Sequence, residues 1–522
     1  MTDSSAAELR RFAAREIAGT VHTEGELLER CATDMSMFRR RPRAVVRPRD
    51  EADLRALLAF AREHRVPLTP RGGGSNTGGA AISPGIVVLF DGGEQWSGIS
   101  YDERRGEITA GPAVRHDELQ RALSERGRML PSDPSSGPLS RIGGNVATRA
   151  SGPHALKHGA IDRYLSALRV ITADGAVLET DRRDTIPAQL LGGIDTLGDR
   201  IRADAESRRL LEQRRSQKIA SGYNLFAFLE DEAHLARARL FAGSVGTLAL
   251  VTGIRLSTEP LEDGRTTVEV YFDSAEAAVT AADRAVELGA AACEFLNGEC
   301  LRIVRQHYPT LQVPEAGALL LLEFTGPGHA AAAGGLAREL GGGRADRGGG
   351  FPRARVSSDP GQQQVLWDVR KRLLFTVKNP KPGQEALSVV NDVGVPRDRL
   401  AELVRFAEKL FDRLGITAPI YGHAGSGNLH MRPIFDLTTP NVVHTVETVA
   451  AEIYGAVCEL GGTITAEHGM GPLRAPYLHL EWPEAVTGYM RELKELFDPA
   501  GILNPGAVFP DAPRHPYRFV AD

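Results

Sequence analysis

The chain has 522 residues, which is long for a single hydrophobic core, so we expect at least two domains. Hydrophobic residues make up 42% and charged residues 25% of the chain, and this composition excludes a disordered protein. The net charge of −5 excludes a basic footprint for nucleic acid, and the longest apolar runs are far too short to span a membrane.

The four cysteines are scattered and form no Cys-x-x-Cys pair. They predict neither a disulfide framework nor an iron–sulfur cluster bound by this chain alone. The N-terminus, MTDSSAAELRRF, carries an acidic residue before any apolar stretch, so we expect no secretory signal. We therefore expect a cytoplasmic protein, with a peripheral position at the inner face of the membrane left open.

Residues 1–30 carry the pattern of one amphipathic helix at the surface. From Pro42 onward, strand and helix patterns alternate: a strand at AVVRP, a helix at ADLRALLAFAREHR and a buried strand at GIVVLF. Residues 165–180 predict two strands joined by a turn at Ala173-Asp174-Gly175. This alternation indicates a first domain of α/β texture.

After Pro260 the pattern changes to strand–helix–strand–helix units, which include the apolar stretch ALLLLEF from Ala318. These units predict an α+β second domain. The turn-rich tail FDPAGILNPGAVF is expected to pack back on the first half. The predicted organisation is an N-terminal helical arm, two domains and a C-terminal segment, at residues 1–37, 38–260, 261–495 and 496–522.

Three glycine-rich loops stand out in the chain. The first, PRGGGSNTGG from Pro70, lets backbone N–H groups approach an anion, and its hydroxyls add donors. It is neither a P-loop nor a Rossmann fingerprint. The second comprises PSDPSS and IGGNVA, and the third is GSVGTL. Each loop alone also fits a plain structural turn, but three loops joined by strands indicate a long anionic ligand lying over the backbone.

With SGYNL and FDPAGILNPG, these loops resemble the FAD-binding oxidoreductases of the vanillyl-alcohol oxidase type, in the order typical of that family. Within the family, the chain is similar to D-lactate dehydrogenases and to the flavin subunit of glycolate oxidase. The resemblance implies a PCMH-type FAD-binding domain of two α/β subdomains, an α+β substrate (cap) domain with an antiparallel sheet, and a C-terminal segment that returns to the FAD domain.

The resemblance also implies noncovalent FAD, with the pyrophosphate at residues 71–79 and the isoalloxazine over residues 131–147. Covalent members carry a His in the first loop, where this chain has Ser75 and Asn76. The residues that the resemblance assigns to FAD are Pro70, Arg71, Gly72, Gly73, Gly74, Ser75, Asn76, Gly78, Pro131, Asp133, Ser135, Ser136, Gly143, Gly144, Asn145, Ala147, Gly243, Gly246, Thr247 and Asn504.

A second constellation contains His423, His430 and, farther along, Glu467-His468. Two imidazoles on a glycine-bent segment and a distant carboxylate are suitable ligands for a divalent metal such as Zn, Mn or Fe. The spacing H-x₆-H is no named ligand motif, and histidines with ordinary structural roles remain an alternative. The resemblance to D-2-hydroxyacid dehydrogenases assigns His423, His430 and Glu467 as metal ligands and His468 as the catalytic base.

Arginines complete the predicted site. The segment Trp367-x-x-Arg370 resembles one whose Arg holds the substrate carboxylate, a task that suits the bidentate guanidinium. Asn428 and Arg432 are further predicted substrate-binding residues. Relatives that act on 2-hydroxyglutarate carry a Lys near position 390, where Val390 stands here, which argues against a dicarboxylate unless Arg432 restores the charge.

The resemblance implies FAD-dependent, metal-assisted oxidation of a D-2-hydroxy acid, such as D-lactate or glycolate, to the 2-oxo acid. Electrons would pass to a quinone, a cytochrome, an electron-transfer flavoprotein or an iron–sulfur protein. LHMRPIFDL also resembles long bacterial fusions with an iron–sulfur module that this sequence lacks. Two alternatives stay open: a flavin oxidase or dehydrogenase of another alcohol, and a flavin subunit active only with an iron–sulfur partner. A homodimer is also left open.

Overall fold

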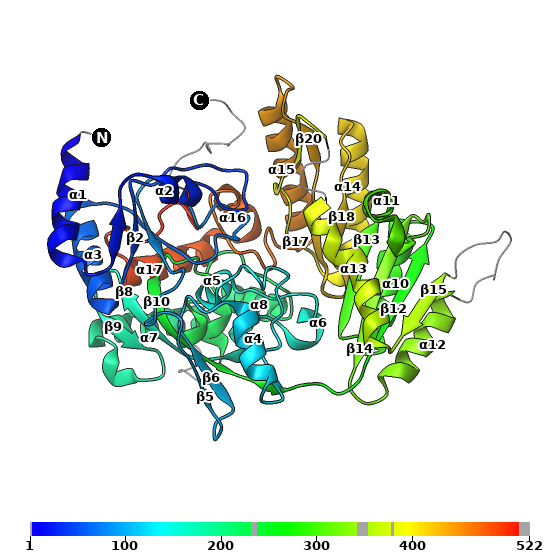
Figure 1. Cartoon of the computed structure of the whole chain (residues 1–522), viewed down its shortest axis with the longest axis horizontal. Coiled ribbons are helices and arrows are strands. Elements are labelled where there is room, and N and C mark those ends of the chain that lie inside the picture. The colour runs from blue at the N-terminus through cyan, green and yellow to red at the C-terminus, as the bar shows by residue number, and fades with distance from the viewer. Residues whose placement is uncertain (1–2, 231–236, 342–352, 377–380, 511–522) are drawn as a thin grey trace.

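The computed structural model describes residues 3–230, 237–341, 353–376 and 381–510. Figure 1 shows the sheets and helices of the first half beside a second group, which the chain forms after residue 260. Helices and mostly antiparallel sheets occur in both groups, so the predicted α+β class is confirmed. In the described part of the chain, no helix is both long and apolar enough to cross a bilayer.

The single helix predicted over residues 1–30 is wrong. The chain forms α1 (Asp3–Glu16), β1 (Thr20–His22) and α2 (Glu26–Cys31) instead. The break lies at Gly19, where a Cβ would lie 2.1 Å from the carbonyl oxygen of Arg47 on the strand paired with β1. The buried carboxylate of Asp53 also accepts the N–H groups of Ala18 and Gly19, which are therefore unavailable to a continuous helix.

The first sheet carries the first glycine loop at its edge. Its strand order is β1-β2-β4-β3, and β2 and β3 both run parallel to β4. The crossover from β2 to β3 is α3 (Glu51–His64), whose N-cap Asp50 accepts two backbone N–H groups. The other strands are β2 (Ala44–Arg47), β3 (Leu68–Arg71) and β4 (Ile86–Leu89). Because β3 ends at Arg71, the loop emerges at the carboxyl ends of parallel strands.

The second sheet is antiparallel, with the order β5-β6-β10-β8-β9. The predicted turn at residues 173–175 joins β8 to β9 and is confirmed. A two-stranded ribbon pairs β7 with β11. The strands are β5 (Ile99–Asp102), β6 (Glu107–Ala110), β7 (Arg128–Met129), β8 (Leu165–Thr172), β9 (Val177–Glu179), β10 (Ala249–Ser257) and β11 (Glu259–Pro260). The helices are α4 (His116–Ser124), α5 (Ile142–Thr148), α6 (Ala155–His158), α7 (Ala188–Ala203) and α8 (Ala205–Arg214).

The third sheet has seven strands in the order β15-β12-β14-β13-β18-β19-β17, and all its pairs are antiparallel. Its strands are β12 (Arg265–Phe272), β13 (Ala292–Asn297), β14 (Ala318–Thr325), β15 (Ala354–Ser357), β17 (Val393–Gly394), β18 (Ile420–His423) and β19 (Asn428–Met431). A separate pair joins β16 (Gln384–Ala386) to β20 (Ile434–Asp436). This sheet bears out the antiparallel sheet predicted after residue 260.

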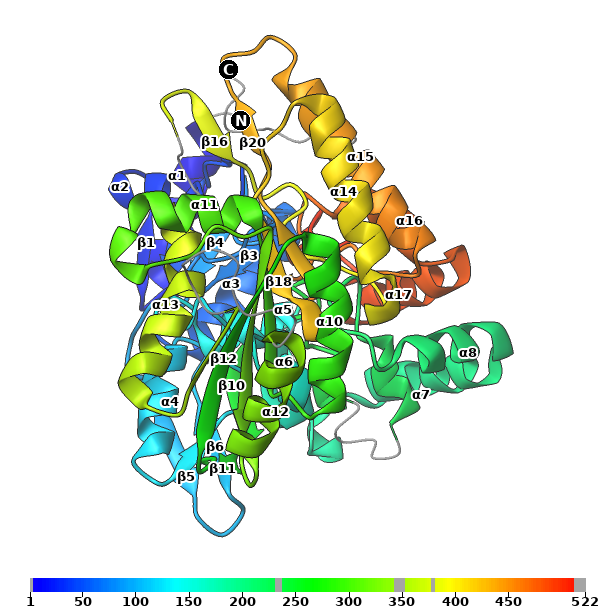
Figure 2. The ribbon, with the colours of Figure 1, turned by 90° about the vertical axis from the view of Figure 1, so that its right-hand side faces the viewer.

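Helices cover both faces of this sheet, as Figure 2 shows with α10 and α12 on one side of β12 and α13 on the other. The apolar run of β14 follows from this, because Leu320 and Leu322 pack into one core cluster while Leu319 packs into another. The helices are α10 (Ala275–Glu287), α11 (Gly298–His307), α12 (His329–Gly341), α13 (Pro360–Thr376), α14 (Leu400–Leu414) and α15 (Val442–Glu459).

The end of the chain lies against the first half. After α16 (Leu478–Glu481), helix α17 (Glu484–Phe497) packs on α7, and the chain then pairs with β3. The N–H of Leu68 donates to the carbonyl of Ile502, and the N–H of Asn504 donates back to the carbonyl of Leu68. Residues 511–522 of the predicted C-terminal segment lie outside the described residues. The predicted domain boundaries stay predictions.

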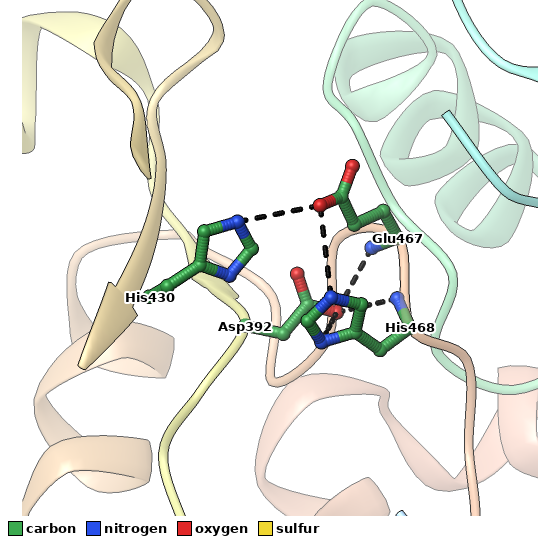
Figure 3. Close-up of side chains that lie close together, drawn as sticks. All are labelled: Asp392, His430, Glu467 and His468. Carbon is green, nitrogen blue, oxygen red and sulfur yellow. Dashed lines mark hydrogen bonds and ion pairs between the residues drawn. The ribbon is translucent and has the colours of Figure 1, made fainter. Parts of the chain in front are cut away.

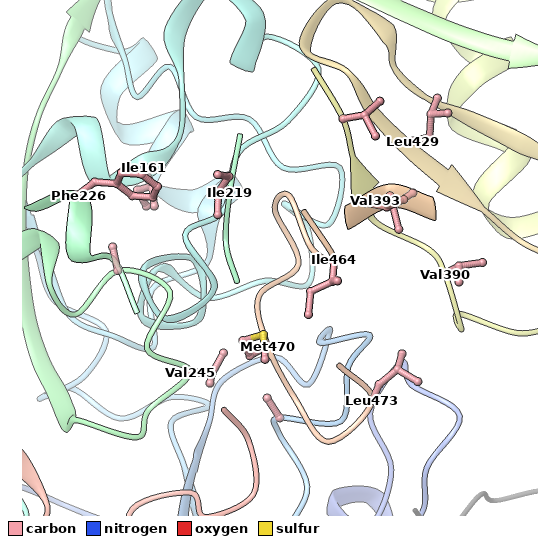
Figure 4. Packing of buried hydrophobic residues seen from close by; sticks show 14 of the residues in the cluster. Ile161, Ile219, Phe226, Val245, Val390, Val393, Leu429, Ile464, Met470 and Leu473 are labelled. Carbon is pink, nitrogen blue, oxygen red and sulfur yellow. The ribbon is translucent and has the colours of Figure 1, made fainter. Parts of the chain in front are cut away.

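One large hydrophobic cluster extends through both groups of elements. Figure 4 shows part of it, with Ile161 and Val245 from the first half and Val393 and Leu429 from the second. Met470, from the loop before α16, belongs to the same cluster and is fully buried. A shared core holds the two halves in one arrangement, so loops of the first half and strands of the second can form a site together.

Candidate active site

A cavity of about 440 Å³ lies between the glycine loops and the third sheet. Its lining comes from the three loops of the first half and, on the facing wall, from the segments that carry the predicted chemistry. The predicted FAD-binding residues among its lining are Pro70, Arg71, Gly72, Gly73, Gly74, Ser75, Asn76, Ser135, Ser136, Gly143, Gly144, Asn145, Ala147 and Gly246. The facing wall contains Arg370, His430, Arg432, Glu467 and His468.

The loop side of this cavity suits an elongated ligand rich in hydrogen-bond acceptors. A Cβ added at Gly144 would meet no protein atom within 4 Å, so its backbone leaves open space that a ligand can approach. Three buried donors that line the cavity, Thr77 Oγ1, Ser140 Oγ and Asn145 Nδ2, have no hydrogen-bond partner among the described residues. Buried donors without partners call for acceptors from a ligand, and FAD carries such acceptors along its length.

Six predicted FAD residues lie outside the cavity lining: Gly78, Pro131, Asp133, Gly243, Thr247 and Asn504. The Asn504 amide donates to the carbonyls of Ala80 and Val245, so it fastens the first and third loops to each other. The hydroxyl of Thr247 pairs with the Tyr223 hydroxyl at 2.7 Å. These two side chains therefore support the loops from behind.

Asp133 turns toward the third sheet. Its Oδ2 lies 2.6 Å from Nδ1 of His154, whose Nε2 lies 2.7 Å from Oε1 of Glu323 on β14. Burial alone would lower the pKa of His154, but the two carboxylates raise it to about 10. His154 is therefore an imidazolium at neutral pH and links the second glycine loop to the third sheet. Glu323 also accepts from Trp367 Nε1, one turn of α13 before Arg370.

The predicted metal ligands converge. His423 ends β18 and His430 lies in β19, and the tight hairpin between them needs Gly427, whose φ is +71° and where a Cβ would lie 2.0 Å from the Val395 carbonyl oxygen. Glu467 Oε1 lies 3.2 Å from His423 Nε2 and 3.3 Å from His430 Nε2, and the two nitrogens are 3.4 Å apart. Ligand atoms about 2 Å from a common ion have separations of this size.

Protein groups hold the other nitrogen of each imidazole. His423 Nδ1 lies 2.5 Å from Glu294 Oε1, and His430 Nδ1 lies 3.2 Å from the Asn391 carbonyl. Such outer partners fix the ring orientation and direct Nε2 toward an ion. Although burial opposes it, the carboxylate of Glu294 beside Nδ1 raises the pKa of His423. Binding of a divalent ion at Nε2 would require that nitrogen in its unprotonated form.

Lys218 is a residue of this cluster that sequence reasoning missed. Its Nζ lies 2.5 Å from Glu467 Oε2 and 3.0 Å from Asn428 Oδ1, and its side chain is only 8% exposed. Ser151 also donates to Oε2, at 2.9 Å. With Oε2 occupied by these two donors, Glu467 presents Oε1 to the histidines. Burial opposes ionisation of Glu467, but Lys218 and His423 hold its pKa well below the usual range.

A second group of potential ligands overlaps the first. Asp392, His430, Glu467 and His468 each have one potential ligand atom within 4.8 Å of the others. Figure 3 shows these four side chains. Asp392 is already saturated: Oδ2 accepts from the Thr465 hydroxyl and from the backbone N–H groups of Glu467 and His468, while Oδ1 accepts from an amide. We therefore regard Asp392 as the group that shapes the Glu467-His468 turn, rather than as a ligand.

His468 lines the cavity beside the ligand cluster. Its Nε2 lies 3.7 Å from Glu467 Oε1, and its ring stacks on His430 with centroids 5.1 Å apart. Burial lowers the pKa of His468 to about 4, which keeps the imidazole neutral at physiological pH. The Asn76 amide donates to the His468 carbonyl, so the first glycine loop directly supports this residue. A neutral, cavity-facing imidazole is able to accept a proton.

The predicted carboxylate-binding residue also lies in the wall. Arg370 of α13 donates from Nε to Glu294 Oε2 at 2.9 Å, and its guanidinium stacks 4.6 Å from the ring centroid of Tyr421. Although burial opposes it, His423 and Arg370 lower the pKa of Glu294 to about 2. Glu294 therefore connects Arg370 to His423, a predicted metal ligand.

Asn428 and His423 do not line the cavity. Asn428 is fully buried, and its amide donates to Asp392 Oδ1 and to the Val393 carbonyl while its oxygen accepts from Lys218. This places Asn428 behind the ligand cluster, although we predicted it to touch the substrate. Sequence reasoning also missed Ser151, Glu294 and Asp392. The one available signal was the scarcity of lysine, since 218 is one of seven lysine positions among 62 basic residues.

Comparison with known proteins identifies the class. Residues 42–181 match the family model described as "FAD binding domain", and residues 262–508 match "FAD linked oxidases, C-terminal domain". Alkyldihydroxyacetonephosphate synthase shares the fold, with a TM-score of 0.63 and 16% identity over 97% of this chain and 85% of that one. The fold and cavity thus define an FAD-linked oxidoreductase of the PCMH type, and the predicted fold class and flavin cofactor are confirmed.

Individual proteins similar to this chain show which members of the family it resembles. The chain is 30% identical over 474 residues to "Glycolate oxidase subunit GlcD" of Bacillus subtilis (strain 168), covering 90% of this chain and 89% of that protein. It is 27% identical to "D-lactate dehydrogenase" of Archaeoglobus fulgidus, covering 89% and 90%. It is also 27% identical to "D-2-hydroxyglutarate dehydrogenase" of Escherichia coli (strain K12), although the match spans only 50% of that longer protein. The chain belongs to the family of FAD-linked oxidases, as predicted.

Proposed function

We propose that this protein oxidises a D-2-hydroxy acid, of the size of D-lactate or glycolate or somewhat larger, to the 2-oxo acid. The observation that supports this proposal is the facing wall of the cavity, where Arg370, the imidazole of His468 and two of the predicted metal ligands lie opposite the loops for FAD. The third predicted ligand, His423, contacts Glu467 from behind this wall. The names of the relatives point to the same substrates.

Each residue has a separate task in this proposal. Arg370 binds the substrate carboxylate through the guanidinium atoms that do not contact Glu294. His468 takes the hydroxyl proton at an imidazole nitrogen. FAD held by the glycine loops would supply the two-electron acceptor for the hydride from Cα, which leaves the 2-oxo acid as the product.

His423, His430 and Glu467 would hold a divalent ion, and Zn, Mn and Fe all suit this ligand set. Such an ion would supply Lewis acidity that makes the substrate hydroxyl easier to deprotonate. Lys218 and Ser151 orient Glu467 toward the two histidines. We further propose that the electrons leave the flavin for a quinone, a cytochrome, an electron-transfer flavoprotein or an iron–sulfur protein.

An anaerobic visible spectrum tests the function. Purified protein with FAD should lose its oxidised flavin absorbance when one D-2-hydroxy acid is added, and should keep it with the L-enantiomer. Flavin that stays oxidised with every 2-hydroxy acid, at full FAD and metal content, would contradict the proposal.

Metal analysis tests the ligand set separately. His423→Ala and Glu467→Gln should lower the bound metal to background while FAD stays bound, because they remove predicted metal ligands and leave the glycine loops intact. Exposed His479 offers a matched control: His479→Ala should keep the metal. Equal metal content in all three variants would rule out these ligands.

A further inference from the structure

Arg432 differs from Arg370 and Lys218, the other cations near the ligand cluster, because the described residues give it no anionic partner. Arg370 contacts Glu294, and Lys218 contacts Glu467. Among the described residues, no carboxylate forms an ion pair with Arg432, and Nη1 donates only to the Ser388 hydroxyl, at 2.5 Å. Such a cation calls for an anion from a ligand.

The fold directs this cation toward the cavity. Arg432 follows the last residue of β19, two positions after His430, so the two side chains leave the strand on the same side. Both line the cavity, as does Tyr421 of the neighbouring strand, whose ring stacks on Arg370. Two residues of a strand span about 7 Å, so Arg432 reaches a part of the cavity separate from the ligand cluster at His430.

We propose that the substrate carries a second anionic group, which Arg432 binds while Arg370 binds the first carboxylate. The proposal rests on the proposed function and names its substrate class: 2-hydroxy acids with a side-chain carboxylate or phosphate. The guanidinium pairs with either group in the same way, through two parallel N–H donors. Arg432 is thus a specificity-determining residue, because a substrate without the second anion leaves the charge of this half-buried side chain unpaired.

Binding of 2-oxo acid products tests this without turnover. We would measure dissociation constants of 2-oxoglutarate and 2-oxopentanoate, which have the same chain length, by calorimetry on the FAD-loaded protein. The dicarboxylate should bind at least about 30-fold more tightly, the factor expected for a charge-assisted hydrogen-bonded pair. In Arg432→Met this ratio should fall to about 1, and Arg432→Lys should retain part of it because the charge remains.

Turnover separates the two sources of the second anion. The ratio of kcat/KM should favour D-2-hydroxyglutarate or D-3-phosphoglycerate, both 2-hydroxy acids, over D-2-hydroxypentanoate. The substrate with the higher kcat/KM shows whether the second anion is a carboxylate or a phosphate, and either result supports the proposal. Arg372 on α13, which is exposed and paired with Asp368, is the matched control, and Arg372→Met should leave every ratio unchanged.

Three results would overturn the inference. Equal binding of both 2-oxo acids by the wild-type protein would show that the site does not recognise a second anionic group. An equal loss of both ligands in Arg432→Met and Arg432→Lys would show that Arg432 holds the first carboxylate. A preference unchanged in Arg432→Met, at normal FAD content and Tm, would assign it to another residue. By contrast, a protein that binds no 2-oxo acid and reduces no flavin with any 2-hydroxy acid would contradict the proposed function itself.

Discussion

On the loop side of the cavity, the groups that face a ligand are largely backbone and small hydroxyls, while on the facing wall they are charged side chains. The loop residues are consecutive in the sequence, as in the run from Gly72 to Ser75. The wall residues come from distant segments, and Lys218 contacts a carboxylate 249 positions away. A substitution in the loops can therefore change ligand affinity with little effect on the charge balance of the site. A substitution in the wall removes one member of a network of paired charges.

The charge network explains how so many ionisable groups are buried together. Glu467 has Lys218, Glu294 has Arg370 and His423, and Asp392 has backbone N–H groups. Removing one partner from such a pair leaves an uncompensated buried charge, which costs more than the pair itself contributes.

The largest effect is expected at His468. Replacing it by Ala removes the proton acceptor and should slow flavin reduction by about 10³-fold, within the range of general base catalysis, while FAD and metal content stay normal. Stopped-flow absorbance under anaerobic conditions measures the rate. Exposed His479→Ala serves as the control and should react at the wild-type rate. Reduction of His468→Ala at the wild-type rate would remove this residue from the mechanism.

A smaller effect is expected at Lys218, on the same side. Lys218→Met leaves Glu467 Oε2 without its cation and should weaken metal binding about 10- to 100-fold, the usual cost of losing an outer partner. Metal competition with a chromophoric chelator measures this, and Lys218→Arg should recover part of the affinity. Lys409→Met, at an exposed position of α14, should have no effect. An unchanged metal affinity in Lys218→Met would show that Glu467 does not depend on it.

The opposite side is tested at Gly144. A Cβ there meets no protein atom but enters the space assigned to FAD, so Gly144→Ala should fold normally and bind FAD about 10-fold more weakly. Fluorescence titration of the apoprotein with FAD gives the dissociation constant. Gly455 of α15 also has open space, and Gly455→Ala should bind FAD normally and gain about 0.5–1 kcal/mol of stability. FAD binding unchanged in Gly144→Ala would move the flavin away from this helix.

The junction between the two sides is tested at His154. Its folded-state pKa of about 10 exceeds the unfolded value near 6.5, so its stabilising contribution is complete below pH 6.5 and declines as the pH rises toward 10. The Tm difference between the wild type and His154→Gln should therefore be largest at pH 6 and shrink by pH 10. Exposed His444→Gln is the control. A difference that stays constant over this range would show that no imidazolium bridges Asp133 and Glu323.

The sequence predicted the residues on the loop side of the cavity more completely than those on the facing wall. Fourteen of twenty residues predicted for FAD line the cavity, because glycines and hydroxyls next to one another in the chain act through the local backbone. Asp133 and Asn504 are exceptions, since their side chains turn away from the cavity to His154 and to the carbonyls of Ala80 and Val245. The predicted helix over residues 1–30 failed for a similar reason, because the strand that displaces it begins only at residue 44.

The sequence by itself determined the class of protein, the order of the glycine loops and the two histidines that a short hairpin brings together. These are local properties: turn geometry, strand periodicity and motifs whose residues lie within a few positions of one another. Only the tertiary structure decided that Lys218 and Ser151 orient Glu467, that Glu294 joins Arg370 to His423, and that Arg432 has no carboxylate beside it among the described residues. The reason is physical: a buried charge is stabilised by whatever groups the packed chain brings near it, and that proximity is a property of the whole fold.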